Sequence, residues 1–468
     1  MARMRLTLPA ALSLALLTAL PVAARPQDAA APSVPATEAA PRYLVERIDL
    51  EGLEETRASE VRRRLLIRPG ELLDEGRVLL SRLRLLQLGW FSRVESRVER
   101  GSARGQVVLV FQLVERNTLV VSDLFLGSTP AQRLYGGLGL TEQNFLGMGL
   151  GLSGAAVYGG APAELPGAPH RFSARASLYD ADLELGGLPT LVAGVTGLWI
   201  RGDELSCTDP GCDAFDGHLE RAPRLRYERL GGEVSLGIRP GPFERLLGGL
   251  RLERVDGSFL PGAAGPAQVG TPPALRLGGS ALVAFTGTYE RDTRDDLFFP
   301  AGGGRFAAQV TFSSPAVGSD YEYSRWLLQL EKDLSLPRGH GLRLVAAAGA
   351  VQGDAPFFER FYAADWAYFS VGPALGRALE LNFSTDSRYD ALLAMGGAEY
   401  AVPLWRSEGI FRRGYLALGA RAVWSAARSR AGRDPLSSTP LSADAALRLD
   451  TPVGSFNVSL AYALDNFL

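Results

Sequence analysis

The chain has 468 residues, of which 46% are hydrophobic and 21% are charged, and its formal net charge is −2. This near-neutral balance gives no electrostatic basis for nucleic-acid binding. After the N-terminal segment no apolar run approaches the roughly 20 residues that a membrane-spanning helix needs, which excludes a helical membrane protein.

The first 24 residues predict a signal peptide for export. Two arginines precede an apolar stretch at residues 6–22, and small residues follow at Val22-Ala23-Ala24. An anchoring helix is the alternative, but about 17 apolar residues interrupted by prolines are short for a membrane span. Residues 25–42 are rich in alanine and proline without periodicity, and we expect them to form a flexible leader.

Residues 43–116 predict a small α+β domain with the element order β-α-α-β-β. Two stretches carry apolar residues at helical spacing, and Asp74 is a candidate N-cap for the second of them. That helix stops at Gly89, as glycine favours a helix end. The predicted elements are a strand at residues 45–50, helices at 56–66 and 75–88, and strands at 91–98 and 108–111.

Residues 117–468 predict an all-β region, because helical spacing disappears and short alternating segments recur between turns. At roughly 22 residues for a strand and its connection, the region accommodates about 16 antiparallel strands. The clearest strand is the last, whose apolar positions are Phe456, Val458, Leu460, Tyr462 and Leu464. A large soluble β-sandwich is the alternative, but a strand with one apolar face in an exported chain favours a transmembrane barrel in the outer membrane.

The sequence offers no residues for a catalytic or cofactor site. Residues 149–154 have the G-x-G-x-x-G spacing of a dinucleotide-binding loop, but residues 155–169 are rich in glycine and proline. This favours a tight hairpin over the helix that such a loop requires. The three histidines are far apart, and no G-x-S-x-G motif occurs. We therefore expect no enzyme, and neither a cofactor nor a metal.

Two further polar groups have structural interpretations. The charges at residues 291–296 are compatible with a metal site or paired acids, but a solvated turn whose charges neutralise one another is favoured. Cys207 and Cys212 flank a turn-forming Thr-Asp-Pro-Gly sequence. In an exported chain, a local disulfide is therefore expected rather than a metal site.

Short motifs along nearly the whole mature chain resemble the BamA/TamA superfamily of outer-membrane assembly proteins. In the small domain they are similar to one copy of the superfamily's periplasmic POTRA module, and afterwards to hairpins of its surface-antigen-type barrel. The motifs are at residues 48–53, 68–71, 88–94 and 111–115 in the small domain, and at 140–149, 289–295, 358–362, 395–400 and 450–454 in the all-β region.

The resemblance implies a large loop that folds into the barrel, with Phe361 and Tyr362 on its approach. Members of the superfamily usually carry an Arg-Gly pair in this loop, whose arginine reaches the barrel wall. This chain has Tyr-Phe-Ser-Val-Gly-Pro at residues 368–373 instead. Our hypothesis is that Arg377, a few residues later, reaches the same wall.

The resemblance also implies that the protein inserts or translocates other proteins at the outer membrane, with the POTRA-like domain in the periplasm. A sheet edge presents unpaired N–H and C=O groups, so a client strand can dock along Phe91, Val94 and Val98, although an edge that is covered or only structural is the equally weighted alternative. The client then pairs at a barrel seam weakened by glycines. The predicted seam residues are Leu138, Leu140, Phe456, Val458, Leu460 and Tyr462.

The partners expected from this resemblance are the outer-membrane lipid bilayer, unfolded outer-membrane or secreted proteins, and periplasmic chaperones or lipoproteins. Two other functions stay open at this point. One is a secretion pore dedicated to a single partner, and the other is a passive channel or structural barrel.

Overall fold

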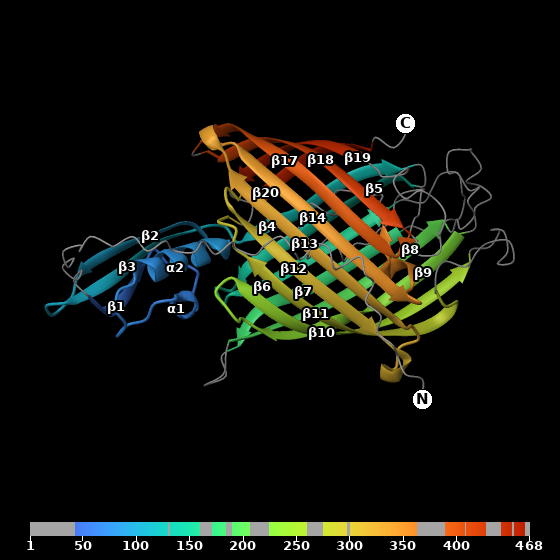
Figure 1. Ribbon diagram of the computed structural model, residues 1–468, viewed down its shortest axis with the longest axis horizontal. Coiled ribbons are helices and arrows are strands. Elements are labelled where there is room, and N and C mark those ends of the chain that lie inside the picture. Colours follow the sequence, from blue (N-terminus) through green and yellow to red (C-terminus); the bar gives the residue numbers. More distant parts are fainter. Residues whose placement is uncertain are drawn as a thin grey trace, which may run out of the picture. The chain divides into compact units, whose positions relative to one another are not determined.

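The computed structural model describes residues 43–129, 132–159, 171–183, 190–205, 224–259, 275–296, 300–362, 389–407, 409–426, 441–451 and 454–463. The predicted signal peptide and leader lie outside these residues. None of the helices in the described part of the chain has the length and apolar character needed to cross a membrane. Figure 1 shows both α-helices in the N-terminal part of the described chain and a large sheet formed by the rest.

Residues 43–116 form the predicted α+β domain. Its sheet has the order β1-β3-β2, with β1 parallel and β2 antiparallel to the central strand β3. Buried side chains of both helices, such as Val61 and Leu85, pack in one core with Phe111 of the sheet. The elements are β1 (Leu44–Glu51), α1 (Ala58–Arg64), α2 (Glu75–Gln87), β2 (Phe91–Arg100) and β3 (Gln106–Glu115).

Local chemistry sets the ends of α2 where the sequence predicted them. The side chain of Asp74 accepts a hydrogen bond from the backbone N–H of Arg77 at 3.1 Å, which satisfies one of the free donors at the helix start. Beyond the last turn, Gly89 has a φ of +74°, a left-handed conformation that glycine adopts without steric cost. Both helix ends are thus confirmed.

Fifteen strands in the described part of the chain after residue 117 form one antiparallel sheet, which agrees with the expectation of about sixteen. The strands are β4 (Leu119–Thr129), β5 (Gln132–Phe145), β6 (Leu150–Gly159), β7 (Arg171–Leu183), β8 (Leu191–Leu205), β9 (Arg224–Ile238), β10 (Glu244–Phe259), β11 (Gly278–Asp292), β12 (Gly303–Ser313), β13 (Tyr323–Ser335), β14 (Gly341–Gly353), β17 (Leu392–Arg406), β18 (Arg413–Ala426), β19 (Leu441–Thr451) and β20 (Gly454–Ala463). Two short strands, β15 (Phe361–Tyr362) and β16 (Tyr389–Asp390), pair separately.

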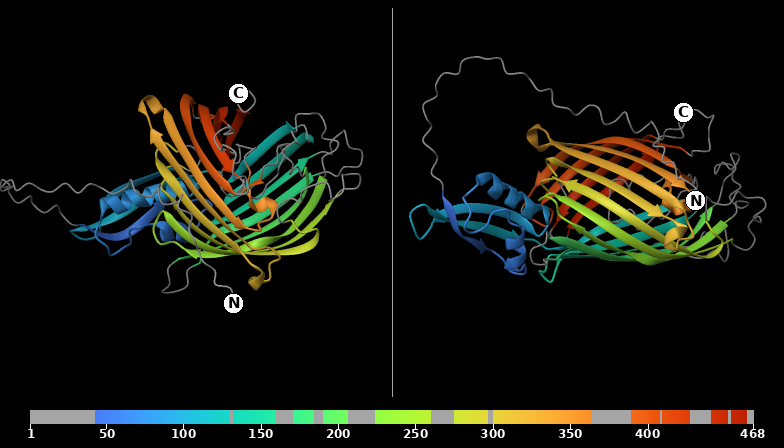
Figure 2. Two further views of the ribbon diagram at one scale, coloured as in Figure 1. Left: turned by 45° about the vertical axis from the view of Figure 1, so that its right-hand side comes forward. Right: turned by 60° about the horizontal axis from the view of Figure 1, so that its bottom comes forward.

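The two faces of the large sheet differ in polarity. On β10, Leu250 and Leu252 are 38% and 53% exposed, whereas Glu253 is only 5% exposed and Val255 is fully buried. Neighbouring strands repeat this alternation, because successive side chains of a strand point to opposite faces. Figure 2 shows that the strands are tilted and the sheet is curled. The exposed face is therefore mostly apolar, and the opposite face carries the buried charged groups.

The first and last strands of the sheet, β4 and β20, adjoin each other. Some of their Cα atoms come within 8 Å. Among the described residues, however, no hydrogen-bonded ladder joins them. Because each of the fifteen strands runs antiparallel to its neighbour, β4 and β20 run in the same direction. The sheet thus curls until its edges meet, without a ladder across the seam.

Candidate functional site

Strand β2 is an edge of the POTRA-like sheet, as the docking prediction requires. Its side chains differ in accessibility: Phe91 and Val94 are each 2% exposed and belong to the core, whereas Val98 is 52% exposed. A client on this edge would therefore meet backbone groups and the Val98 side chain, but not Phe91 or Val94. The Arg82 guanidinium already donates to the Val94 carbonyl at 3.2 Å.

The opposite edge of this sheet, β1, is partly covered. Backbone hydrogen bonds join Val45 to Glu71 and Gly70 at 2.9 and 2.8 Å, and a third joins Leu73 to Tyr43 at 2.8 Å. The segment between α1 and α2 therefore lies along the start of β1. Of the two edges, β2 offers the longer free backbone.

The turn between β5 and β6 binds the POTRA-like domain. The backbone N–H of Arg57 donates to the Gly147 carbonyl at 3.1 Å, and the Asn144 amide donates to the Thr56 hydroxyl at 2.9 Å. The Trp90 indole N–H donates to the Gln143 carbonyl at 2.8 Å. This turn lies in the motif at residues 140–149, so the hairpin predicted at residues 149–154 begins earlier in the chain, and Gly151 and Gly154 belong to the following strand.

Two glycines leave room for the close approach of the β5–β6 turn to the POTRA-like domain. Gly147 and Gly149 have φ values of +66° and +70°. A Cβ atom on Gly147 would lie 2.1 Å from the Glu55 carbonyl oxygen, and one on Gly149 would lie 2.7 Å from a nitrogen of Arg64. Residues after Gly149 continue as strand β6 rather than as a helix. Gly147 therefore permits a backbone contact with the POTRA-like domain, Gly149 allows its side chains to approach, and Gly151 and Gly154 lie within strand β6.

The charge cluster at residues 291–296 is neutralised partly within itself, as predicted, and partly by residues of neighbouring strands, and it is not simply solvated. Arg294 pairs with Asp292 at 2.6 Å and with Glu331 of β13 at 3.4 Å, and its side chain is only 13% exposed. Asp296 pairs with Arg413 of β18 at 3.1 Å. This turn also reaches the POTRA-like domain, because the Gln87 amide donates to the Asp292 carbonyl at 3.4 Å.

Arginine–carboxylate pairs line the inner face of the sheet. Desolvated charges are retained in a protein when they are paired and hydrogen-bonded, and these side chains meet that condition. The pairs include Arg229–Glu253 at 2.8 Å, Arg245–Glu290 at 2.6 Å, Arg343–Asp333 at 2.8 Å and Arg448–Glu399 at 2.6 Å. A polar interior opposite an apolar exterior is typical of membrane barrels.

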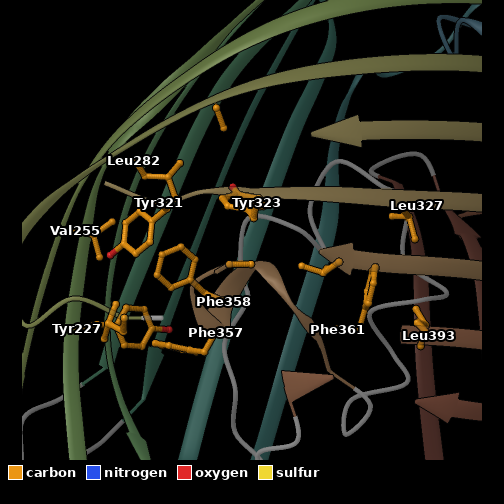
Figure 3. Close-up of a cluster of buried hydrophobic side chains, with 14 of the residues drawn as sticks. Tyr227, Val255, Leu282, Tyr321, Tyr323, Leu327, Phe357, Phe358, Phe361 and Leu393 are labelled. Atoms are coloured by element: carbon orange, nitrogen blue, oxygen red, sulfur yellow. The ribbon is translucent and has the colours of Figure 1, made fainter. Parts of the chain in front are cut away.

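The segment that follows β14 folds onto this inner face. Its residues Phe357, Phe358 and Phe361 are at most 4% exposed and pack with Tyr227 of β9 and Leu393 of β17, among others. Figure 3 shows the three phenylalanine rings among side chains contributed by several strands. Phe361 therefore lies in a segment that packs against the inner face of the sheet. Of Tyr362 only the backbone is described, where it pairs with Tyr389.

The predicted seam is displaced by one strand. Leu138 and Leu140 lie on β5, which pairs with β4 on one side and β6 on the other, so β4 and not β5 is the edge. Two register shifts interrupt β4, and only three residues separate it from β3, so its sequence lacks a clear period of two. On the other edge, the backbone positions of Phe456, Val458, Leu460 and Tyr462 all lie on β20.

Other predicted residues lie outside the described part of the chain. They are Cys207 and Cys212, with their expected disulfide, and Arg377, with its expected contact to the wall. These three assignments stay predictions.

Three candidate site residues were not predicted from the sequence. Glu359, Arg229 and Arg251 meet where the segment after β14 contacts strands β9 and β10 of the large sheet. The sequence signal that could have identified the two arginines is a charged residue at an inward-facing position of an alternating strand. Arg229 on β9 and Arg251 on β10 occupy the same face as buried apolar residues, which is unusual unless a partner neutralises them.

Comparisons with known proteins identify both parts of the chain. The Omp85 superfamily domain matches residues 204–467, and a POTRA family described as a surface antigen variable number repeat matches residues 43–116. The outer membrane protein assembly factor BamA of Nitratidesulfovibrio vulgaris is 23% identical over 325 residues, which cover 69% of this chain and 36% of that protein. The chain thus spans about a third of the length of this curated relative.

Solved structures show the same fold. CdiB from Escherichia coli has a TM-score of 0.60 at 13% identity, over 90% of this chain and 73% of that one. CdiB from Acinetobacter baumannii has a TM-score of 0.52 at 10% identity, over 90% and 74% of the two chains. The superfamily match alone covers more than half of the sequence. The chain therefore belongs to the Omp85 superfamily of bacterial outer-membrane proteins, whose members are non-enzymatic and have their POTRA domains in the periplasm.

Proposed function

We propose that this protein inserts or translocates other proteins at the outer membrane, and that an extended client strand pairs first with β2 and then with the β4–β20 seam. The observation that carries the proposal is the seam itself, where two strand edges adjoin without a ladder among the described residues. Unpaired strand edges accept another strand through backbone hydrogen bonds.

The direction of the two edges specifies how a client would bind. Since β4 and β20 run in the same direction, one added strand can run antiparallel to both of them and complete two ladders at once. Two strands that flank a third lie about 9.6 Å apart, whereas some Cα atoms of β4 and β20 are within 8 Å. The seam must therefore widen before a client strand enters.

Strand β4 is suited to such a movement. It pairs on one side only, with β5, which places Gly136, Gly137 and Gly139 opposite residues 123–126. Glycines weaken a strand because they contribute no side-chain packing. The glycines assigned to the first strand from the sequence thus lie next to it and weaken its attachment to the sheet.

The test is in-cell photocrosslinking from probes at Val98 on β2, Phe125 on β4 and Leu460 on β20. Leu138 on β5 is the matched control, because it is 46% exposed but lies one strand from the edge. Several different outer-membrane proteins captured at the three edge probes and not at Leu138 would support insertion. Periplasmic chaperones or lipoproteins captured at Val98 would add accessory partners to the clients.

Two other outcomes would replace the proposal. One recurring secreted protein, captured at the barrel probes, would identify a dedicated secretion pore. Steady ion conductance with no captured client at any probe would identify a passive channel.

A further inference from the structure

We propose that Glu359 docks the inward segment, residues 354–361, onto an arginine pair of the barrel wall and so holds a plug in the lumen of the resting protein. Glu359 is a positioning residue in this proposal. The inference goes beyond the proposed function, because it concerns the pore in the absence of a client.

The Glu359 carboxylate is the only charged group of its short 3₁₀ helix, Phe357–Glu359. It accepts a hydrogen bond from the Arg251 guanidinium at 2.6 Å and lies 3.9 Å from a nitrogen of Arg229. The side chains of Glu359 and Arg229 are 3% and 4% exposed. A charge-assisted hydrogen bond at such a desolvated site is stronger than one between neutral groups.

The wall holds this arginine pair in place without the segment. Arg229 donates two hydrogen bonds to Glu253 at 2.8 and 3.1 Å, and Arg251 donates to the Tyr323 hydroxyl at 3.1 Å. The fully buried carboxylate of Glu253 pairs with both wall arginines, and Glu359 adds a second carboxylate to the same pair.

Aromatic contacts complete the docking site on both sides of Glu359. The Arg229 guanidinium lies 4.0 Å from the centre of the Phe358 ring, and Arg325 lies 5.2 Å from that of Phe361. Cations bind the faces of aromatic rings favourably at these distances. Phe357 packs edge-on against Tyr227 with ring centres 5.0 Å apart.

The wall also leaves space for Phe361. A Cβ atom on Gly349 of β14 would lie 2.2 Å from the Phe361 ring, so any larger residue would displace that ring. By contrast, a Cβ atom on Gly396 of the neighbouring strand β17 would meet nothing within 4 Å. The two glycines therefore form a matched pair for a test that leaves Glu359 unchanged.

The charged group that reaches the wall differs from the one predicted. The resemblance implied that a loop arginine reaches the barrel wall, whereas here a carboxylate of the segment reaches two wall arginines. On the other side of the barrel, the wall acid Glu399 is already paired with the wall arginine Arg448 at 2.6 Å. Docking through Glu359 needs no arginine in the loop.

The experiment measures how fast a cysteine in the segment is labelled. Ala355 is fully buried, so Ala355→Cys in full-length protein lacking Cys207 and Cys212 is protected from a polar maleimide while the segment is docked. Glu359→Gln and Gly349→Ala should each raise the labelling rate about ten-fold and increase the channel conductance in planar bilayers. Gly396→Ala should change neither quantity. The same holds for Asp256→Asn, which breaks an exposed ion pair with Arg254 on β10.

Both assays use only protein that runs on a gel as a heat-modifiable band, which shows that the barrel is folded. If Glu359→Gln alone prevents folding, the double variant Glu359→Gln/Arg251→Met removes the unpaired charge and should show the same ten-fold increase. Unchanged labelling in the folded Glu359 variant would overturn the proposal. Equal increases in the control variants would also overturn it. No client is present in either assay, so this result does not depend on client capture.

Discussion

The POTRA domain and the barrel differ most in the side chains that they expose. In the POTRA domain apolar side chains such as Val45, Leu85 and Phe111 are fully buried. In the barrel, charged side chains such as Arg229 and Glu253 are buried beside apolar ones, while large apolar side chains cover the exposed face. The hydrophobic effect explains both arrangements, because the surrounding medium is water for one and lipid for the other. The exposed fraction of a side chain therefore has a different meaning in the two regions.

The largest expected effect is the loss of a core aromatic residue from the POTRA domain. Phe111→Ala should lower the free energy of unfolding of this domain by about 3–5 kcal/mol, because the fully buried ring leaves a cavity. Pulse proteolysis of the full-length protein over a urea series measures this loss. Phe285→Ala, on the exposed face of β11, is the control and should leave the POTRA transition unchanged. Equal shifts of the POTRA unfolding transition in both variants would contradict the separation of the POTRA core from the barrel.

The sharpest test of the comparison uses two side chains of almost equal exposure. Leu252 of the barrel is 53% exposed and Val98 of the POTRA domain is 52% exposed. Leu252→Arg should destabilise the folded barrel in lipid by about 2–4 kcal/mol, because its charge meets the bilayer. Val98→Arg should change stability by less than about 0.5 kcal/mol, because its charge meets water. Equal costs in reversible unfolding from lipid vesicles would show that Leu252 does not face lipid.

A smaller effect is expected where the two regions touch. Gly147→Ala and Gly70→Ala each place a side chain on a left-handed residue, which costs about 1–2 kcal/mol. Only Gly147 also meets a backbone oxygen, that of Glu55, whereas Gly70 has nothing within 4 Å. Gly147→Ala should therefore speed hydrogen exchange of the Arg57 amide, which donates to Gly147, and Gly70→Ala should not. No difference between the variants would mean that the hairpin does not hold the POTRA domain.

The smallest expected effect is a pH dependence confined to the POTRA domain. Partial burial of the Glu115 carboxyl works to raise its pKa, but hydrogen bonds from the backbone N–H groups of Glu55 and Thr56, both 2.9 Å long, outweigh this and hold the pKa below its ordinary value. A depressed pKa in the folded state stabilises the domain above the unfolded-state pKa. This stability is lost as the pH falls through the folded-state pKa.

We therefore expect POTRA stability to fall as the pH drops below the usual glutamate range near 4.5. Glu115→Gln should cost about 1 kcal/mol at pH 7 and flatten this dependence. Pulse proteolysis between pH 7 and pH 3 measures both effects. An unchanged acid dependence in the variant would assign the effect to other carboxyl groups.

The POTRA fold was predictable from the sequence because its signals are local. Asp74 and Gly89 mark the two ends of α2 where the sequence predicted them, and the apolar spacing identified the buried faces of both helices. The strand content of the barrel was predictable for the same reason. Strand β4 was not, because its register shifts interrupt the alternation on which strand prediction depends.

The docking site of the inward segment needed the structure. Glu359 and Arg251 are 108 residues apart, and no periodic pattern connects them. The contact of the hairpin turn with the POTRA domain also joins distant residues, since Asn144 and Thr56 are 88 apart. The sequence showed glycines at this turn, but only the structure shows that a Cβ atom on Gly147 would meet a carbonyl group of the POTRA domain.

The central claim is that β4 and β20 present unpaired edges to a client strand. Hydrogen exchange of the full-length protein in lipid nanodiscs, with and without a peptide that carries a client's terminal strand, tests it most directly. We predict that amides of β4 and β20 exchange faster than those of the adjacent strands β5 and β19, and that the peptide slows their exchange. Equal protection of all four strands, unchanged by the peptide, would show a closed ladder and contradict the claim.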